Sequence, residues 1–84
     1  MAMEKVKMIT STDRVRMYNF FDGFIVTAEQ YFPAALDATP DGWRDTIWTV
    51  LQTRERADEV FDEFVSTQIR YAKALNKPII CKEE

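Results

Sequence analysis

The 84-residue chain has no histidine, only one cysteine, two glycines and three prolines. The lack of histidine excludes imidazole metal sites, histidine-based catalytic triads and imidazole acid–base catalysis near neutral pH. The single cysteine, Cys81, cannot form an internal disulfide, which favours a reducing compartment. No apolar run has the length of a signal peptide or of a membrane span, so we expect a cytoplasmic protein without membrane contact.

The remaining composition is that of one small folded domain, residues 1–84. Hydrophobic residues make up 46% of the chain and aromatic residues 13%, far more than a disordered tail contains. Eleven Lys and Arg stand against fourteen Asp and Glu, a net charge of −3, so we expect no direct binding to nucleic acid. A domain this small is stable alone only if its core is densely packed; otherwise it must bury further apolar surface against a partner.

Helical periodicity predicts a mainly α fold, a three-helix bundle-like domain with helices near residues 12–32, 40–52 and 54–76. Pro33 is expected to end the first helix and Pro40 to begin the second. An unbroken helix over residues 40–76 would be about 55 Å long, at ~1.5 Å per residue, which is too long for a compact monomer of this size. We therefore expect a break near residues 52–53, with Thr53 capping the third helix.

The two ends of the chain are candidates for short β-strands. Charged and apolar residues alternate over residues 4–10, as in a strand with one solvated face. Residues 79–81 form a short apolar segment after Pro78, and it could pair with residues 6–8. Short terminal strands beside a helical core are therefore an option.

The third predicted helix begins with a cluster of carboxylates, which are Glu55, Asp58, Glu59, Asp62 and Glu63. One interpretation is an acidic patch that docks on a basic surface. The other is a solvated helix start, because acidic residues near the N-terminus and basic residues near the C-terminus match the helix dipole. Glu59 and Asp62 resemble half of a magnesium-binding pattern, but no second helical pair exists upstream, so we expect no metal and no cofactor.

Aromatic residues are more numerous than a small three-helix core can hide. Trp43 and Trp48 are five residues apart and so lie on different sides of one helix, and at least one is expected at an interface. Gln68 sits within an apolar stripe flanked by Tyr71, where it needs either a core partner or a contact across a subunit interface. Gln68 and Tyr71 are therefore the candidate oligomer interface.

These features predict a non-catalytic, homo-oligomeric protein that binds and covers the surface of a partner protein of unknown identity. The expected partner-binding residues are Phe20, Phe24, Trp43 and Trp48 together with the five carboxylates. Small acidic proteins of this kind are often accessory inhibitors from phages or plasmids, so an inhibitor of viral type is expected from size and charge alone. The alternative is a protein that binds or sequesters an anionic nucleotide at a subunit junction through Arg14, Arg44 and Arg54.

Overall fold

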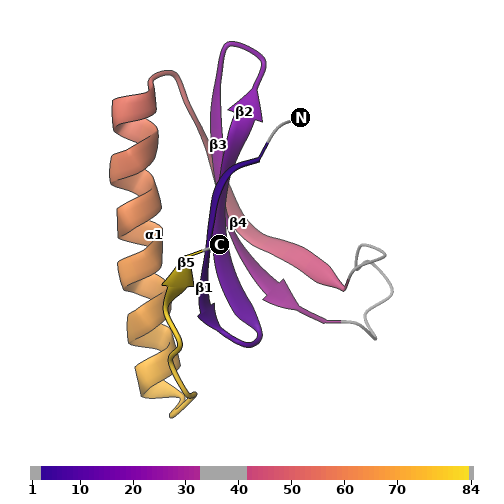
Figure 1. Ribbon diagram of the computed structural model, residues 1–84, viewed down its shortest axis with the longest axis vertical. Helices are drawn as coiled ribbons and strands as arrows, with labels where there is room; N and C mark the ends of the chain where they lie inside the picture. The colour runs from indigo at the N-terminus through magenta and orange to yellow at the C-terminus, as the bar shows by residue number, and fades with distance from the viewer. Residues whose placement is uncertain (1–2, 33–41, 84) are drawn as a thin grey trace.

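The computed structural model describes residues 3–32 and 42–83, which form one antiparallel sheet with one helix packed on it (Figure 1). The elements follow one another as β1 (Met3–Thr10), β2 (Asp13–Phe20), β3 (Gly23–Tyr31), β4 (Trp43–Leu51), α1 (Arg54–Ala74) and β5 (Lys82–Glu83). Within these residues the strands lie in the order β4-β3-β2-β1-β5, each antiparallel to its neighbours. The prediction of an all-α, three-helix bundle is therefore wrong.

The first predicted helix, residues 12–32, is instead the β2–β3 hairpin. The two strands pair along their whole length around a turn made of Phe21 and Asp22. Phe21 adopts a φ of 54°, which the tight turn requires. Gly23 lies so close to β4 that a Cβ atom there would be 2.4 Å from the carbonyl oxygen of Leu51. The Asp-Gly pair therefore marks a hairpin that the helical periodicity concealed.

The second predicted helix, residues 40–52, is β4 over its described part, and Pro33 and Pro40 lie outside the described residues. Its apolar side chains recur at intervals of four, as they do on one side of a helix. A register shift between β3 and β4 leaves Thr46 as a bulge, so Trp43, Trp48 and Val50 lie on one face of β4 and Ile47 and Leu51 on the other. Because both faces carry apolar residues, the segment lacks the alternation typical of a strand.

The third predicted helix, residues 54–76, is confirmed as α1. Thr53 is its N-cap, as expected, and the Thr53 hydroxyl accepts a hydrogen bond from the backbone N–H of Arg56 at 3.2 Å. β4 ends at Leu51 and α1 begins at Arg54, so the cap at Thr53 lies directly between the strand and the helix.

The terminal strands are confirmed in part. The strand expected over residues 4–10 is β1. The C-terminal strand β5 follows the expected residues 79–81 rather than covering them, and it pairs with Lys7 and Met8 of β1. β5 therefore extends the sheet beyond β1.

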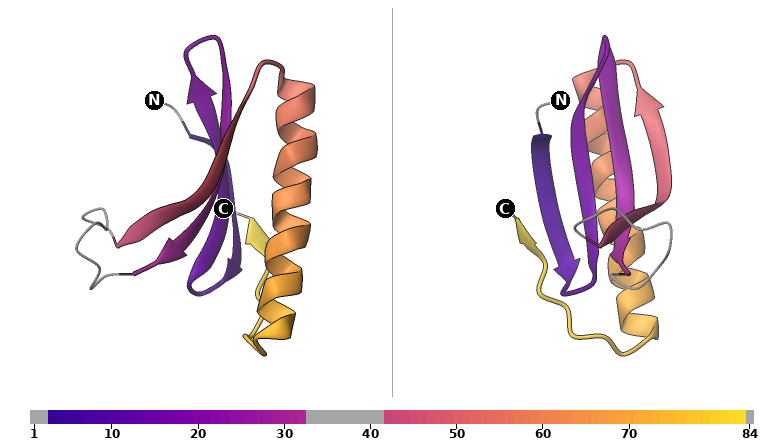
Figure 2. Two further views of the ribbon diagram at one scale, coloured as in Figure 1. Left: turned by 180° about the vertical axis from the view of Figure 1, so that it is seen from behind. Right: turned by 90° about the vertical axis from the view of Figure 1, so that its right-hand side faces the viewer.

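The hydrophobic core lies between α1 and one face of the sheet (Figure 2). Its buried members are Ile9, Val15, Met17 and Val26 from the strands and Ala57, Val60, Phe61 and Val65 from α1. The helix residues recur at intervals of three and four, so they form a single apolar stripe facing the sheet. Burial of this stripe is the main stabilising contribution that α1 makes.

Asp13 joins the β1–β2 turn to the segment that follows α1. Its buried carboxylate accepts hydrogen bonds from the Thr10 hydroxyl at 2.6 Å and the Lys77 ammonium at 3.0 Å, and Gln30 donates to its other oxygen at 3.2 Å. Burial alone would raise the pKa of Asp13, but these hydrogen bonds outweigh it and hold the pKa below 3.8. The ion pair with Lys77 fixes the end of α1 against the sheet.

We predict that Phe61→Ala lowers the free energy of unfolding by about 3–5 kcal/mol, because it empties a buried aromatic site in the core. The matched control is Phe21→Ala, since the Phe21 side chain is 91% exposed and its loss should change the same free energy by less than about 0.5 kcal/mol. Urea denaturation followed by circular dichroism measures both. Equal losses for the two variants would contradict this assignment of the core.

Candidate functional site

The candidate site is the face of the sheet that points away from α1, here called the open face. In the part of the chain that the structure describes, no helix or strand packs on it, and in Figure 2 (right) it lies in front of α1. Successive side chains of a strand point to opposite faces of the sheet, so the neighbours of a core residue along its strand point to the open face. They are Val6 and Met8 on β1, Arg14, Arg16, Tyr18 and Phe20 on β2, Ile25, Thr27, Glu29 and Tyr31 on β3, and Trp43, Asp45, Trp48 and Val50 on β4.

A buried carboxylate lies at the centre of the open face. Glu29 is only 2% exposed, although no described element covers it. The Nε–H of Arg14 donates to one Glu29 oxygen, and the Nε–H of Arg16 donates to the other at 2.6 Å. Removing either arginine would leave a buried charge without full compensation, which is strongly destabilising. The three side chains therefore hold one another in a fixed arrangement.

Each arginine also packs on an aromatic ring. The guanidinium carbon of Arg14 lies 4.1 Å from the centre of the Trp43 ring, and that of Arg16 lies 4.9 Å from the centre of the Tyr18 ring. Such cation–π contacts orient the guanidinium planes and cover the carboxylate between them. Among the described residues, only the Nε of each arginine has an acceptor. The terminal nitrogens of both arginines therefore have no hydrogen-bond acceptor within the described residues.

Asp45 lies beside Glu29 in the next strand. Burial raises the pKa of Asp45 above 3.8, a hydrogen bond to Glu29 and the charge of Glu29 raise it further, and Arg16 and Arg14 oppose these effects. The protonated form of Asp45 donates to Glu29, whereas the ionised form repels it. With both acids ionised, the two arginines and two carboxylates of this cluster carry no net charge.

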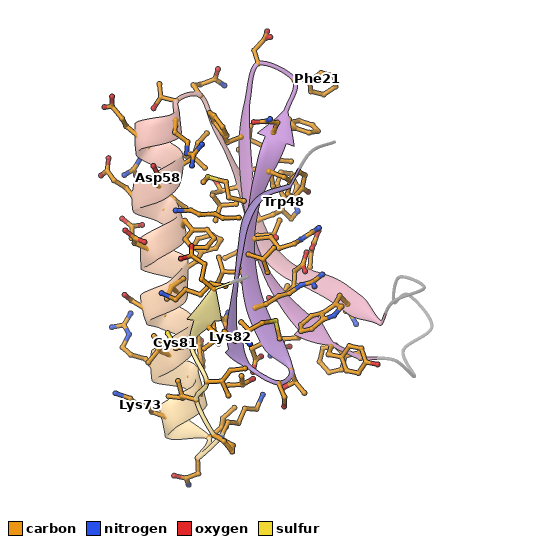
Figure 3. The ribbon with its side chains drawn as sticks, viewed as in Figure 1. Phe21, Trp48, Asp58, Lys73, Cys81 and Lys82 are labelled. Atoms are coloured by element: carbon orange, nitrogen blue, oxygen red, sulfur yellow. The ribbon has the colours of Figure 1, made fainter. Side chains whose placement is uncertain are left out.

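Trp48 is the most exposed aromatic side chain on the open face. It lies opposite Thr27, which pairs on its other side with Arg16, so one strand separates Trp48 from Arg16; the Trp48 side chain is 60% exposed. Figure 3 shows it on the side of the sheet away from α1. Tyr31 and Trp43 stack at a ring-centre distance of 5.4 Å at one end of the same face. The open face therefore combines a fixed charge cluster with accessible aromatic surface.

The structure divides the predicted partner-binding residues between two sides of the molecule. Phe20, Trp43 and Trp48 lie on the open face, whereas Phe24 faces α1 and packs against the core. The five carboxylates, Glu55, Asp58, Glu59, Asp62 and Glu63, lie on α1, and Asp58 is paired with Lys5 at 3.0 Å and with Arg54 at 3.3 Å. These residues do not form one continuous surface, and Figure 3 shows Asp58 and Trp48 on different sides of the sheet.

The arginines predicted for a nucleotide site are also separated. Arg14 lies on the open face, Arg44 packs over Phe32 at 6.0 Å, and Arg54 lies at the start of α1. Arg16 and Glu29, which complete the cluster around Arg14, were not among the predicted site residues. The alternation of charged and apolar residues over β2 was the signal that could have identified Arg16.

The predicted oligomer residues Gln68 and Tyr71 line a groove between α1 and the sheet, together with Ile47. The described residues contain no group of three or more Cys, Asp and Glu placed to hold a metal ion. In the same residues, no helix combines the length and the apolar character needed to cross a membrane.

Compared with family models, with curated proteins and with solved structures, the chain matches none of them. The open face is therefore interpreted from its own residues.

We predict that Asp45→Asn raises the free energy of unfolding at pH 7 by roughly 0.2–1 kcal/mol, because it removes a charge that repels Glu29. A carboxyl whose pKa is raised on folding contributes stability at low pH and loses it as the pH rises through the folded pKa. The gain should therefore shrink to less than half near pH 3.5, where Asp45 is mostly protonated in both the folded and the unfolded state. Urea denaturation at the two pH values measures it.

The matched control for this test is Asp22→Asn, in the exposed β2–β3 turn. It should not increase the free energy of unfolding at pH 7 as Asp45→Asn does, because Asp22 lies in the hairpin turn and not beside Glu29. An Asp45→Asn variant that is no more stable than the unsubstituted protein at pH 7 would contradict the proposed repulsion.

Proposed function

We propose that this protein is a non-catalytic binding module whose open face docks on a polypeptide partner. The observation that carries the proposal is the exposed Trp48 beside the fixed Arg14–Glu29–Arg16 cluster, on a sheet face that no described element covers. Trp, Tyr and Arg are the residues most enriched at the energetic centres of protein interfaces. The open face holds all three types within adjacent strands.

The charge of the open face favours a polypeptide over a nucleic acid. A nucleic-acid surface needs basic residues that remain free to neutralise phosphates. Here Glu29 and Asp45 compensate the charges of Arg14 and Arg16. A partner polypeptide requires no excess positive charge, because backbone carbonyls and single carboxylates can accept from the terminal arginine nitrogens.

We further propose that the protein acts in the reducing environment of the cytoplasm. The single cysteine supports this location, because Cys81 is an exposed free thiol with no internal partner.

We predict that a photoreactive phenylalanine analogue at position 48 cross-links a partner protein in cells that produce the chain. The same analogue at position 62, on α1, is the control and should not cross-link that partner. With the purified partner, Trp48→Ala should weaken binding by roughly 30-fold, the effect of losing about 2 kcal/mol at an interface centre. Calorimetry or surface plasmon resonance measures the affinity.

Phe21→Ala is the matched truncation, because Phe21 is an exposed aromatic at the hairpin turn. It should leave the affinity within about twofold of that of the unsubstituted chain. Cross-linking from position 62 alone, or full affinity of Trp48→Ala, would contradict docking through the open face.

A second candidate function is the binding of an anionic nucleotide on the same face. It is favoured by the terminal nitrogens of Arg14 and Arg16, which have no acceptor among the described residues, and by the Trp48 ring, which lies on the same face two strands from Arg16. Two guanidinium groups can hold a phosphate, and an exposed indole can stack on a base.

For this candidate we predict a thermal shift with a panel of nucleoside mono-, di- and triphosphates. A nucleotide at about ten times its Kd stabilises the fold by about 1.4 kcal/mol, which raises Tm by several degrees. Trp48→Ala should abolish the part of the shift that exceeds that of inorganic phosphate. If no nucleotide raises Tm more than phosphate does, this candidate is excluded.

A further inference from the structure

The outer edge of β4 is the least protected part of the sheet. β4 is the last strand in the order β4-β3-β2-β1-β5, so no described strand pairs with its outer side. Natural proteins protect such edges with lysine, proline, bulges or a covering element. The bulge of β4 lies at Thr46, and Ile47–Leu51 beyond it contains no charged residue and no proline. This five-residue segment therefore remains able to pair with another strand.

Apolar side chains are exposed on both faces beside this edge. On the α1 side, Ile47 is 54% exposed, and on the open face Trp48 is 60% and Val50 is 40% exposed. Exposed apolar surface of this kind on a small domain marks a contact with another polypeptide. A strand added to the edge would cover both faces at once.

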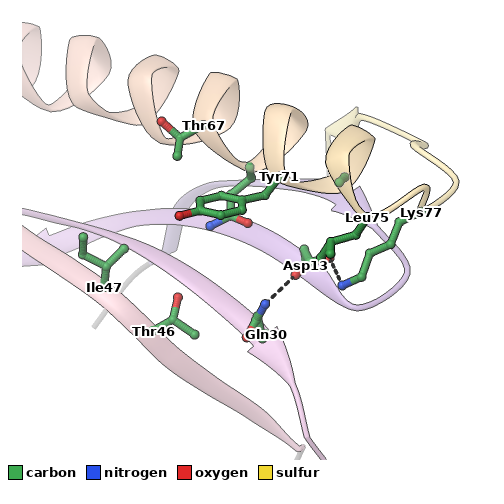
Figure 4. Close-up of a pocket in the computed structure, with 10 residues that line it drawn as sticks. Asp13, Gln30, Thr46, Ile47, Thr67, Tyr71, Leu75 and Lys77 are labelled. Atoms are coloured by element: carbon green, nitrogen blue, oxygen red, sulfur yellow. Dashed lines mark hydrogen bonds and ion pairs between the residues drawn. The ribbon is translucent and has the colours of Figure 1, made fainter.

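A groove on the α1 side adds to the same surface. The end of β3 and the start of β4 bend away from the helix (Figures 1 and 2), and this leaves a groove of about 390 Å³. Figure 4 shows Thr67 and Tyr71 of α1 on one wall and Thr46 and Ile47 of β4 on the other. Tyr71 and Leu75 beside it are each 63% exposed. The groove and the unpaired edge thus lie next to each other.

We propose that the occupant of this edge is a second copy of the chain, paired antiparallel through Ile47–Leu51 about a two-fold axis at Thr49. In this register Ile47 lies opposite Leu51 of the other copy, and Trp48 lies opposite Val50. Both cross-strand pairs are apolar, and the axis carries the small Thr49 side chain.

Other antiparallel registers are less favourable. An axis at Trp48 places Asp45 opposite Leu51, and an axis at Ile47 places Arg44 opposite Val50. Both registers also bring the bulge at Thr46 into the paired segment. An axis at Val50 places Trp48 opposite Gln52, whereas the axis at Thr49 makes both cross-strand pairs apolar and keeps the charged residues and the bulge outside the paired segment.

The two-fold arrangement also extends the groove. The sheets of both copies join into one, and both helices lie on the same face of the joint sheet. Ile47 of each copy, which a monomer leaves 54% exposed, then contacts Leu51 of the other copy on that face. The groove beside Tyr71 opens toward the shared edge.

The test is the solution mass of the full chain, measured by light scattering across the micromolar concentration range. We expect twice the chain mass of 9.9 kDa. Ile47→Lys should weaken dimerisation by roughly 100-fold, because it places an unpaired charge in the interface. Ile80→Lys is the matched control, because Ile80 is 52% exposed and lies beyond β1, away from β4, and it should leave the dimer intact.

A cross-linking experiment tests the register separately. In a Cys81→Ser background, Thr49→Cys should be joined to its copy by a short bifunctional thiol reagent, whereas Ser66→Cys on the exposed side of α1 should not. A monomeric mass for the unsubstituted chain overturns the proposal and assigns the edge to a strand of another protein. A dimer that survives Ile47→Lys, or that cross-links at position 66 and not at 49, also overturns it.

Discussion

The width of a single helix determines which surfaces of this sheet can be buried. A helix with its side chains is about 10 Å across, and strands lie about 4.8 Å apart, so one helix covers about two strands well. α1 lies over β2 and β3, as Figure 2 (right) shows, and contacts β4 less than it contacts β1, β2 or β3. The open face, the outer edge of β4 and the groove beside Tyr71 are all consequences of this limit. Each surface proposed for binding is therefore one that the chain has no second helix to cover.

On the open face a buried carboxylate, Glu29, is stabilised although no described helix or strand covers it. Glu29 lies in the centre of the sheet, where water reaches it poorly, and a charge in such a position needs direct partners. Arg14 and Arg16 supply them from the neighbouring strand, and their aliphatic stems with the rings of Trp43 and Tyr18 exclude water from above. The same contacts restrict the arginine rotamers. A partner therefore meets guanidinium groups that are already oriented, which lowers the entropic cost of binding.

The sequence predicted the elements whose signals are local. Thr53 caps α1 because its hydroxyl accepts a hydrogen bond from the backbone N–H of Arg56, three residues later. This interaction depends only on neighbouring residues. β2 and β3 were predicted wrongly because their stability comes from pairing with each other and from burial of Met17 and Val26 under α1, which a pattern within one segment does not contain. β4 carries apolar residues on both faces, so its sequence lacks the alternation of a strand with one solvated face. The cluster of Arg14, Arg16 and Glu29 could not be predicted from one segment, since only the hairpin register places Glu29 opposite Arg14 and diagonal to Arg16.

The two proposed surfaces reinforce one another in a joint sheet. Pairing of β4 edges leaves most of the open face uncovered, because the new contacts on that face involve only Trp48 and Val50 beside the edge. Two open faces then adjoin, and the two copies of Trp48 lie on the same surface near the axis. A partner that touches both faces binds the second one as an intramolecular event, so weak contacts at each Trp48 combine into a much higher affinity. A small chain that forms one layer and one helix can in this way present a binding surface twice its own width.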